Sequence, residues 1–226
     1  MSVSTSNKEK LLKIYEILLS EAGPRHWWPA KTRFEVMIGA ILTQNTAWKN
    51  VEKAIVNLKK AGALSFKKFS SLNEKEIAKL IKPSGYFNQK AKRLAAFCRF
   101  IKNEYGGIID NMRKQDTALL RKKLLDLNGI GPETADSILL YALDKPIFVI
   151  DLYTKRILSR HNLLPFNATY DEYQKFFMDN LPHNTQLYNE YHALLVFAGN
   201  NYCRRKPKCS ECPLLGFNGH NPAAEI

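Results

Sequence analysis

Acidic residues and long apolar runs are scarce in this sequence. Asp and Glu number 21 against 34 Lys and Arg, which leaves a formal net charge of +13 over 226 residues. Positive charge spread along a chain favours a polyanion as its partner. No apolar run approaches the roughly 20 residues that a membrane span requires, and the first ten residues contain no apolar signal core. We therefore expect a cytoplasmic protein with no membrane partner.

Alternating patterns typical of β-strands are also lacking. The one candidate, residues 147–150, is too short and isolated to build a sheet. Apolar residues instead recur at the three- and four-residue spacing of amphipathic helices. Eight segments have this spacing: Leu11–Leu19, Phe34–Leu42, Val51–Leu58, Ile77–Ile81, Leu94–Ile101, Leu119–Leu127, Ile138–Leu143 and Tyr191–Phe197. Glycine and proline breaks between them predict an all-α fold of about ten short helices.

A Gly-Ile-Gly turn joins two of these helices. The first helix is expected to end at Asn128-Gly129, and the second to begin with Gly131 as N-cap and Pro132 at its first position, where the missing N–H costs nothing. Ile130 can fill the space between the two helices. The exposed backbone N–H groups and the helix dipole of such a turn can hold a phosphate. An ordinary αα-hairpin with a glycine C-cap is the alternative.

The longer pattern around this turn carries a family resemblance. L-x-G-I-G-x-x-T-A, then an apolar helix and V-I-D, resembles the helix-hairpin-helix, Gly/Pro…Asp (HhH-GPD) superfamily of DNA repair glycosylases, which includes endonuclease III. The resemblance implies that the hairpin grips the DNA backbone through Gly129, Ile130, Gly131 and Thr134. It also implies that Asp151 lies in a cleft between two helical domains.

The same resemblance suggests how the domains are divided. Residues 24–146 would form a six-helix domain that holds the hairpin. Residues 1–23 plus 147–226 would form a second helical domain with a C-terminal cysteine loop. We expect a monomer that acts on double-stranded, damaged DNA.

Asp151 is the predicted catalytic residue. Cleavage of an N-glycosidic bond builds positive charge on the sugar, and a fixed carboxylate stabilises that charge and can orient or deprotonate a water. Asp151 also precedes the predicted helix 152–158 and can cap its N-terminus. The two roles are compatible.

Glu133 replaces the residue that would give the enzyme a second activity. Family members that also cut the DNA strand use an amine that forms a Schiff base, from a lysine two residues after the second hairpin glycine. This chain has Glu133 at that position. A carboxylate cannot form an imine, so we expect a monofunctional glycosylase. Another lysine, such as Lys155, is the alternative amine.

The sequence also suggests a base pocket. Adjacent Trp27 and Trp28 precede Pro29, and Trp48 follows shortly. W-W-P followed by F-E-x-x-x-G-A-x-L-T-Q-N-T resembles the 3-methyladenine DNA glycosylase branch. An alkylated purine is cationic and would be attracted to indole rings. Tyr86 and His192 are further pocket candidates, with a structural role as the alternative.

The T-Q-N cluster supplies a predicted DNA wedge. In the family, the residue matching Gln44 enters the duplex where a nucleotide has been extruded, because chemistry on a base requires flipping it out of the stack. Asn45 is assigned to the same wedge. The alternative for Gln44 is a helix C-cap.

Three of the four cysteines are grouped near the end of the chain. In a reducing compartment they are not expected to form disulfides. Cys203-x5-Cys209-x2-Cys212-Pro resembles the C-terminal iron–sulfur loop of endonuclease III relatives, which implies a [4Fe-4S] cluster. The family has six residues in the first gap and a fourth cysteine where this chain has Asn218, so the fourth ligand is not identified. Zinc with His220, or no metal, is the alternative.

These features predict a base-excision-repair DNA N-glycosylase that hydrolyses the bond to a flipped, damaged base, an alkylated purine in our interpretation. One alternative is a bifunctional endonuclease III-type glycosylase and abasic-site (AP) lyase. The other is a damaged-DNA-binding protein that has lost catalysis.

Overall fold

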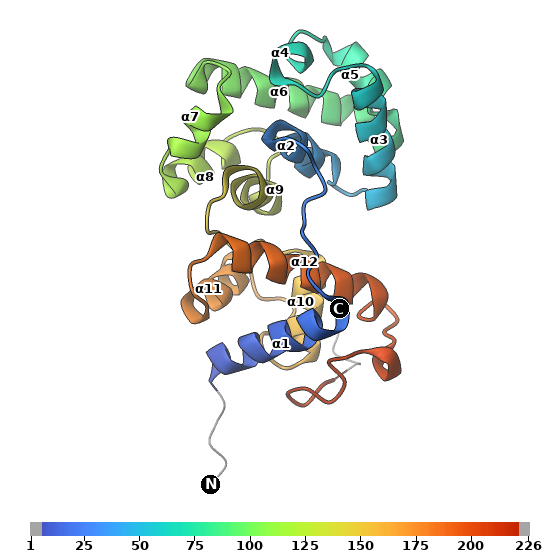
Figure 1. Ribbon diagram of the computed structural model, residues 1–226, viewed down its shortest axis with the longest axis vertical. Helices are drawn as coiled ribbons and strands as arrows, with labels where there is room; N and C mark the ends of the chain where they lie inside the picture. Colours follow the sequence, from blue (N-terminus) through green and yellow to red (C-terminus); the bar gives the residue numbers. More distant parts are fainter. Residues whose placement is uncertain (1–5, 222–226) are drawn as a thin grey trace. The chain divides into compact units, whose positions relative to one another are not determined.

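The protein is helical throughout the part of the chain that the structure describes. A computed structural model describes residues 6–221, and within them it has twelve α-helices and no strand (Figure 1). The predicted all-α class is confirmed. The eight apolar segments lie in helices except for a residue or two at the ends of some of them. None of the helices between residues 6 and 221 is long and apolar enough to cross a membrane.

The chain divides into two compact units. The first, the terminal unit, combines the segment up to Trp27 with the segment from Pro146 onward. The second, the central unit, is Trp28–Lys145. Each has its own buried core, and each is described by itself below.

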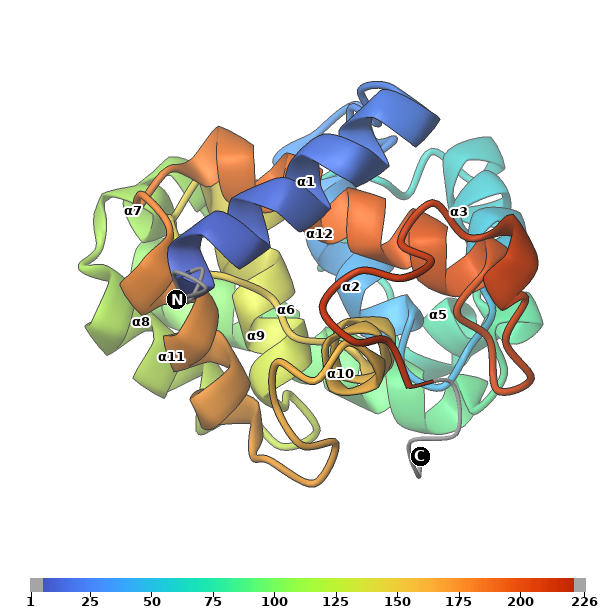
Figure 2. The same ribbon diagram turned by 90° about the horizontal axis from the view of Figure 1, so that it is seen from below.

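The terminal unit is built around an aromatic core. Its α-helices are α1 (Asn7–Ala22), α10 (Leu152–Arg160), α11 (Tyr170–Asn180) and α12 (Thr185–Asn201), and a 3₁₀ turn spans Cys209–Glu211. Helix α12 packs against both α1 and α10 (Figure 2). Phe148 stacks on Phe177 with ring centroids 3.9 Å apart, and Tyr188 and Tyr191 meet the ring of Phe148 edge-on. Burying such large rings is the main favourable contribution to folding of this unit.

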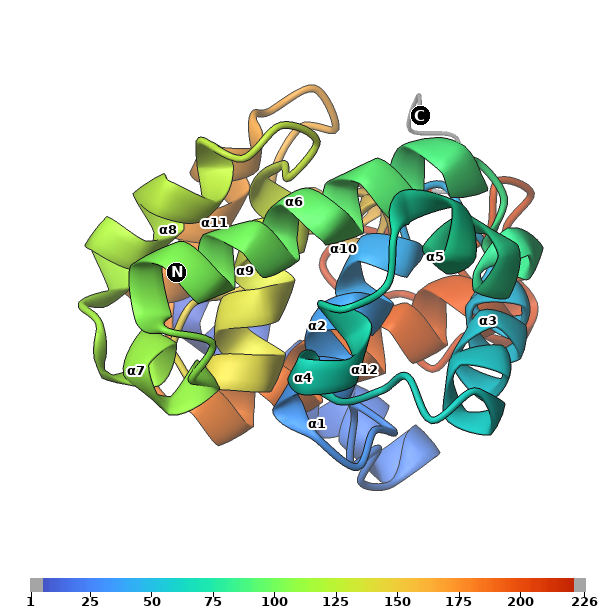
Figure 3. The same ribbon diagram turned by 90° about the horizontal axis from the view of Figure 1, so that it is seen from above.

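The central unit surrounds helix α2. Its elements are α2 (Arg33–Leu42), α3 (Trp48–Lys60), α4 (Phe66–Phe69), α5 (Glu74–Leu80), a 3₁₀ turn (Lys82–Ser84), α6 (Phe87–Tyr105), α7 (Ile109–Lys114), α8 (Thr117–Leu125), α9 (Pro132–Ser137) and a π-helical turn (Ile138–Ala142). Every residue of 34–42 is buried. Helix α6 packs along α5 and also against α2 (Figure 3). Helix α2 is apolar on most of its surface, as expected for a helix at the centre of such a bundle, and its buried Glu35 is paired with Lys59 at 2.5 Å.

One predicted boundary was wrong. Helix α8 ends at Leu125, not at Asn128-Gly129. The N–H groups of Leu127 and Ile130 donate to carbonyls three residues back, at 3.1 and 3.0 Å, so tight turns replace the last helical turn. The hairpin connection is therefore longer than the glycine pattern indicated.

Candidate functional site

Asp151 begins helix α10 in the terminal unit. It is the N-cap residue, with extended backbone angles, and its Oδ1 accepts a hydrogen bond from the N–H of Thr154 at 2.7 Å. The preceding residues, 147–150, have no regular secondary structure and are buried. Helix α11 holds this segment, because Gln174 donates to the carbonyl of Phe148 at 2.6 Å and the Tyr170 hydroxyl accepts from the N–H of Ile150 at 3.3 Å. Asp151 is thus fixed by the helix that follows it and by the segment before it.

A histidine lies beside the Asp151 carboxylate. His192 of α12 places Nε2 3.6 Å from Oδ2, and the two side chains are only 9% and 11% exposed. Burial by itself raises the pKa of Asp151, but the His192 imidazole, with further help from Thr154, outweighs burial and holds that pKa below its ordinary value. The positive end of the helix dipole also favours a negative charge at this position. Asp151 is therefore a carboxylate at neutral pH.

The hairpin lies in the central unit and has the predicted helix start. Gly131 is the N-cap of α9 and Pro132 its first residue. Gly129 has a φ of +83°, a conformation that a residue with a Cβ rarely adopts. Ile130 is buried, as expected for a side chain that fills the space between two helices. Gly131 is exposed.

Gln44 lies against this hairpin. Its Nε2 donates to the carbonyl of Gly129 at 2.8 Å and to the hydroxyl of Thr134 at 3.0 Å. Its Oε1 accepts a hydrogen bond from Arg93 at 2.6 Å. Asn45 is exposed with a φ of +50°. The loop that follows α2 and the hairpin turn are therefore joined by one half-buried side chain.

Lys90 is a site residue that we did not predict. It is 1% exposed, and its Nζ donates to the carbonyls of Leu42 and Ser84 and to the hydroxyl of Thr46, at 2.6–2.9 Å. Three acceptors match the three donors of an ammonium group. Burial first, and then the charge of Arg93, lowers the pKa of Lys90 to about 8. Lys90 is four residues before the buried Leu94 and therefore lies on the same face of α6. This spacing is the feature of the sequence from which its burial could have been predicted.

Two of the three tryptophans meet in the central unit. Trp28 lies edge-on to Trp48, with ring centroids 5.2 Å apart. Tyr141, which the sequence analysis did not select, lies 5.4 Å from Trp28. A Cβ at Gly39 would lie 3.0 Å from the Trp28 ring, so glycine there lets the indole lie directly on α2. Trp28, Trp48 and Tyr141 form what we call the aromatic cluster.

The other predicted pocket residues belong to the terminal unit or are open to solvent. Trp27 belongs to the terminal unit, and Pro29 is exposed. Tyr86 is 68% exposed and has a left-handed backbone with a φ of +45°. His192 belongs to the terminal unit, where it lies beside Asp151.

Glu133 and Lys155 are the two positions considered for a Schiff-base amine. Glu133 is exposed in the first turn of α9. Lys155 of α10 donates from Nζ to the carbonyl of Ala168 at 2.5 Å and lies 5.1 Å above the Tyr173 ring. The Lys155 amine is therefore already hydrogen-bonded within the protein.

The cysteine loop is anchored to α10, the helix that Asp151 begins. Arg156 donates to the carbonyl of Cys203 at 2.6 Å, and Arg160 donates to the carbonyl of Arg204 at 2.8 Å and lies 3.3 Å from the sulfur of Cys203. Both arginines are at least 90% buried. The sulfur of Cys209 lies 3.2 Å from Nε2 of His220. Helix α10 thus carries the candidate carboxylate at one end and supports the loop along its length.

The donors of this loop fit a soft metal by their chemistry. Cys203, Cys209, Cys212 and His220 line one small cavity together with Arg160. Thiolates and imidazole are the ligands that zinc and iron–sulfur clusters take. Within residues 6–221, however, no three histidine, cysteine or carboxylate side chains are arranged so that they could hold a metal ion.

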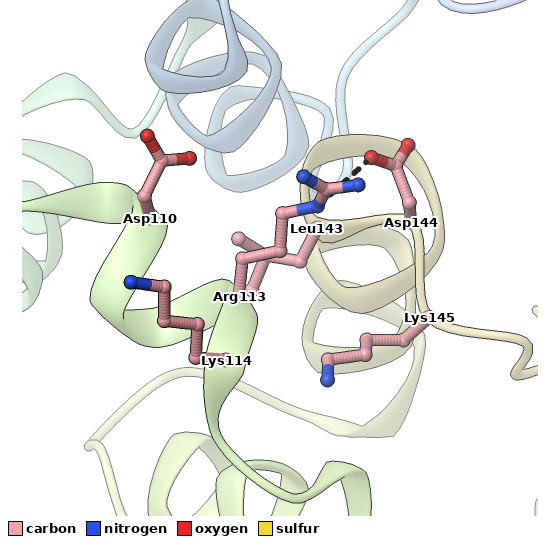
Figure 4. Close-up of a pocket in the computed structure, with 6 residues that line it drawn as sticks. All are labelled: Asp110, Arg113, Lys114, Leu143, Asp144 and Lys145. Atoms are coloured by element: carbon pink, nitrogen blue, oxygen red, sulfur yellow. Dashed lines mark ion pairs between the residues drawn. The ribbon is translucent and has the colours of Figure 1, made fainter.

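A separate pocket of the central unit is lined by charged side chains, some of which form ion pairs within the protein. Arg113 reaches Asp144 at 3.3 Å (Figure 4), and Arg33 reaches the same carboxylate at 2.8 Å. Lys145, on the pocket wall, donates to the carbonyl of Gln115 at 2.7 Å. Arg33 and Arg113 are therefore linked through Asp144, and these two arginines and Lys145 already have partners within the protein.

Comparison with known proteins identifies the family. Residues 38–183 match the model of the HhH-GPD superfamily of base excision DNA repair proteins. A relative from Methanocaldococcus jannaschii, provisionally named a DNA repair glycosylase, is 50% identical over 92% of this chain and 96% of its own length. The chain therefore belongs to the HhH-GPD superfamily and is a DNA repair glycosylase of that superfamily.

Solved structures agree with this assignment. The 3-methyladenine DNA glycosylase MagIII of H. pylori, bound to 1,N6-ethenoadenine, is 31% identical, with a TM-score of 0.75 over 87% of this chain and 98% of that one. Endonuclease III in a trapped covalent intermediate with DNA is 20% identical, with a TM-score of 0.79 over 95% of this chain and 98% of that one. The second likeness concerns the fold alone.

Proposed function

We propose that the protein is a monofunctional DNA N-glycosylase that hydrolyses the bond between deoxyribose and a flipped, alkylated purine. The observation that carries this proposal is the Asp151 carboxylate, held ionised at the start of α10 beside His192. Its charge is available where a positively charged sugar needs it. Because the N-cap hydrogen bond already holds this side chain in place, the reaction does not have to supply the entropy cost of ordering it.

Asp151 has two roles in this mechanism. As the base departs, the carboxylate stabilises the positive charge that develops on the sugar. It also orients a water and accepts its proton as the new C–O bond forms. A cationic purine leaves without a strong general acid, because the electron pair of the broken C–N bond neutralises the positive charge of the base, which departs as a neutral molecule while the positive charge develops on the sugar. One carboxylate is therefore sufficient.

The aromatic cluster supports the proposed substrate class. Indole and phenol rings attract a cationic base through their π faces, and stacking tolerates several purines. The MagIII structure contains an ethenoadenine, which is an alkylated purine. We propose Trp28 and Trp48, with Tyr141 behind them, as part of the base pocket.

The positions of the amines argue against strand cleavage. A Schiff base needs a free amine near the sugar. Position 133 carries a carboxylate, Lys155 donates to Ala168, and Lys90 is buried with its three donors in use. No lyase step is assigned to any of these residues.

DNA is the proposed partner. The net charge of +13 favours a polyanion, and the hairpin presents the exposed Gly131 at a helix start. Gln44 and Asn45 would fill the gap left by the flipped nucleotide. Asp151 belongs to the terminal unit, and the hairpin and Gln44 belong to the central unit, so the proposed reaction requires both units on one DNA.

We propose Cys203, Cys209 and Cys212 as ligands of an iron–sulfur cluster, with His220 as the candidate fourth donor. The shared cavity and the donor chemistry support this proposal. A cluster would supply structural support to the loop, and no catalytic step is assigned to it. Iron, sulfide and zinc analysis of protein purified without oxygen separates cluster, zinc and metal-free forms.

The proposed reaction is tested by the products that it releases. Incubation with DNA carrying alkylated or oxidised bases should release free alkylated purines, measured by mass spectrometry, and leave intact abasic strands. Borohydride should trap no covalent protein–DNA adduct. An adduct would favour the bifunctional alternative, and tight binding to abasic DNA without any base release would favour the inactive damage-binding protein.

His192→Gln is expected to move the acid limb of the pH–rate profile to higher pH. Burial raises the pKa of Asp151, and the His192 imidazole is the main group that lowers it. Without the imidazole the carboxylate takes up a proton at a higher pH, so base release fails earlier on acidification. The stability that the lowered pKa provides exists above the unfolded pKa of about 3.9 and is lost as pH falls through the folded value.

The exposed His183 of the same unit supplies the control. The His183 ring lies 3.1 Å from the carbonyl of Met178 and is not among the groups that shift the pKa of Asp151, so His183→Gln should leave the acid limb in place. An unchanged limb in His192→Gln would show that His192 does not set the charge of Asp151.

A further inference from the structure

Arg93 connects two parts of the central unit that the proposed function uses. Its Nη1 donates to Oε1 of Gln44 at 2.6 Å. Its Nε lies 2.2 Å from the place where a Cβ at Gly129 would be, so the side chain crosses directly over the hairpin glycine. One side chain of α6 therefore touches both the candidate wedge and the candidate DNA grip.

The contacts of Gln44 fix which way round its amide lies. A guanidinium can only donate, so Oε1 must face Arg93. Both N–H groups of Nε2 then point to acceptors, the carbonyl of Gly129 and the hydroxyl of Thr134. Rotating the amide by half a turn would place donor against donor at Arg93 and oxygen against oxygen at Gly129. Arg93 and the carbonyl of Gly129 each disfavour the reversed orientation, so the amide is held from both of its ends.

Helix α6 also holds the backbone of the same loop. Lys90, three residues before Arg93, donates to Leu42 at the end of α2 and to Thr46 after the wedge. Lys90 thus holds the Leu42 carbonyl and the Thr46 hydroxyl on either side of Gln44, and Arg93 holds the side chain of Gln44. The two tasks are separate, and substitution of Arg93 leaves the Lys90 contacts in place.

We propose that Arg93 is a positioning residue, which together with the carbonyl of Gly129 sets the orientation of the Gln44 amide and holds it against the hairpin before DNA is bound. The proposal rests on the wedge role of Gln44 in the proposed function. A wedge that is already ordered does not lose side-chain freedom when it enters the duplex. Loss of Arg93 should then weaken base flipping, while contacts of the wedge with DNA remain possible.

Arg99 offers a matched control on the same helix. Arg93 and Arg99 line one groove with Lys92 and Asn128, and both substitutions remove one positive charge from it. Arg99 is exposed, and the hydrogen bonds of the Gln44 amide go to Gly129, Thr134 and Arg93 instead. A general loss of attraction for phosphate should therefore be similar in Arg93→Ala and Arg99→Ala.

The experiment measures flipping by 2-aminopurine fluorescence in duplex DNA, where the signal rises when the base is unstacked. All variants carry Asp151→Asn, so that no base is removed during the measurement. Arg93→Ala should lower the flipping equilibrium by about tenfold, and Arg93→Lys, which keeps a donor, should restore part of it. Arg99→Ala should change only the salt-dependent binding. Thermal unfolding of each variant checks that it is folded.

A second set in the Gln44→Ala background shows whether Arg93 acts through Gln44. The effect of Arg93→Ala should disappear there, because the residue to be positioned is gone. An undiminished effect, or one equal to that of Arg99→Ala, would overturn the proposal. If Gln44→Ala alone leaves the signal unchanged, the wedge role fails and this proposal fails with it. If Gln44→Ala lowers the signal and Arg93→Ala does not, only the role of Arg93 is rejected.

Discussion

Asp151→Asn is expected to reduce base release by at least about 10²-fold while leaving DNA binding nearly unchanged. Asparagine keeps the side-chain oxygen that accepts from the N–H of Thr154, so α10 retains its N-cap. What disappears is the negative charge that the proposed mechanism uses to stabilise the sugar. Single-turnover base release and equilibrium binding to lesion DNA, measured on the same samples, separate these two properties.

Asp116→Asn provides a control, because Asp116 is also an aspartate that caps the start of a helix. It caps α8 in the central unit, where its side chain accepts from the N–H of Leu119 at 2.9 Å. Asp116→Asn also replaces a capping carboxylate by an amide, and base release should stay at the wild-type rate. Full activity of Asp151→Asn would remove Asp151 from the mechanism.

Gly129→Ala is expected to lower the free energy of unfolding by about 2–4 kcal/mol and to weaken DNA binding. The added Cβ would take up a φ of +83° and would lie 2.2 Å from Nε of Arg93. Arg93 has to move, and its hydrogen bond to Gln44 is lost with it. Chemical unfolding and lesion-DNA binding measure the two effects.

Gly131→Ala shows whether the effect belongs to this particular glycine. At Gly131 the φ is −90°, and an added Cβ would meet nothing within 4 Å. The stability of Gly131→Ala should therefore stay within about 0.5 kcal/mol of wild type. Equal losses in the two variants would show that the turn is generally intolerant, and that the approach of Arg93 is not the cause.

The position of Asp151 joins its chemistry to the fold of the terminal unit. Helix α10 begins at Asp151 and carries Arg156 and Arg160, which hold the cysteine loop through backbone carbonyls. A disturbance of the loop can reach the carboxylate through this one helix. A cluster in the loop would therefore matter for the position of Asp151 without taking part in the reaction.

Features that depend on nearby residues could be predicted from the sequence. The all-α class follows from apolar spacing within single helices, and the start of α9 follows from Gly131 and Pro132. The HhH-GPD assignment follows from a pattern contained within about 30 residues of the chain. In each case the physical cause acts over a few turns of backbone, so the order of residues is enough.

Contacts between distant segments could not be predicted in the same way. His192 lies 41 positions from Asp151, and nothing in N-E-Y-H-A-L-L shows that its imidazole meets that carboxylate. From the sequence alone, Arg93 resembles any solvent-exposed charge on α6. Its contacts with Gln44 and Gly129 exist only in the folded structure. Tyr141 joins Trp28 only because α2 and the π-helical turn pack together.

The sequence by itself therefore determined the family, the helical architecture and the identity of the candidate carboxylate. The tertiary structure decided which charged and aromatic side chains surround that carboxylate and the hairpin. Helix starts and turns depend on local backbone preferences, whereas the pKa of Asp151 and the orientation of Gln44 depend on groups that packing brings within a few ångströms.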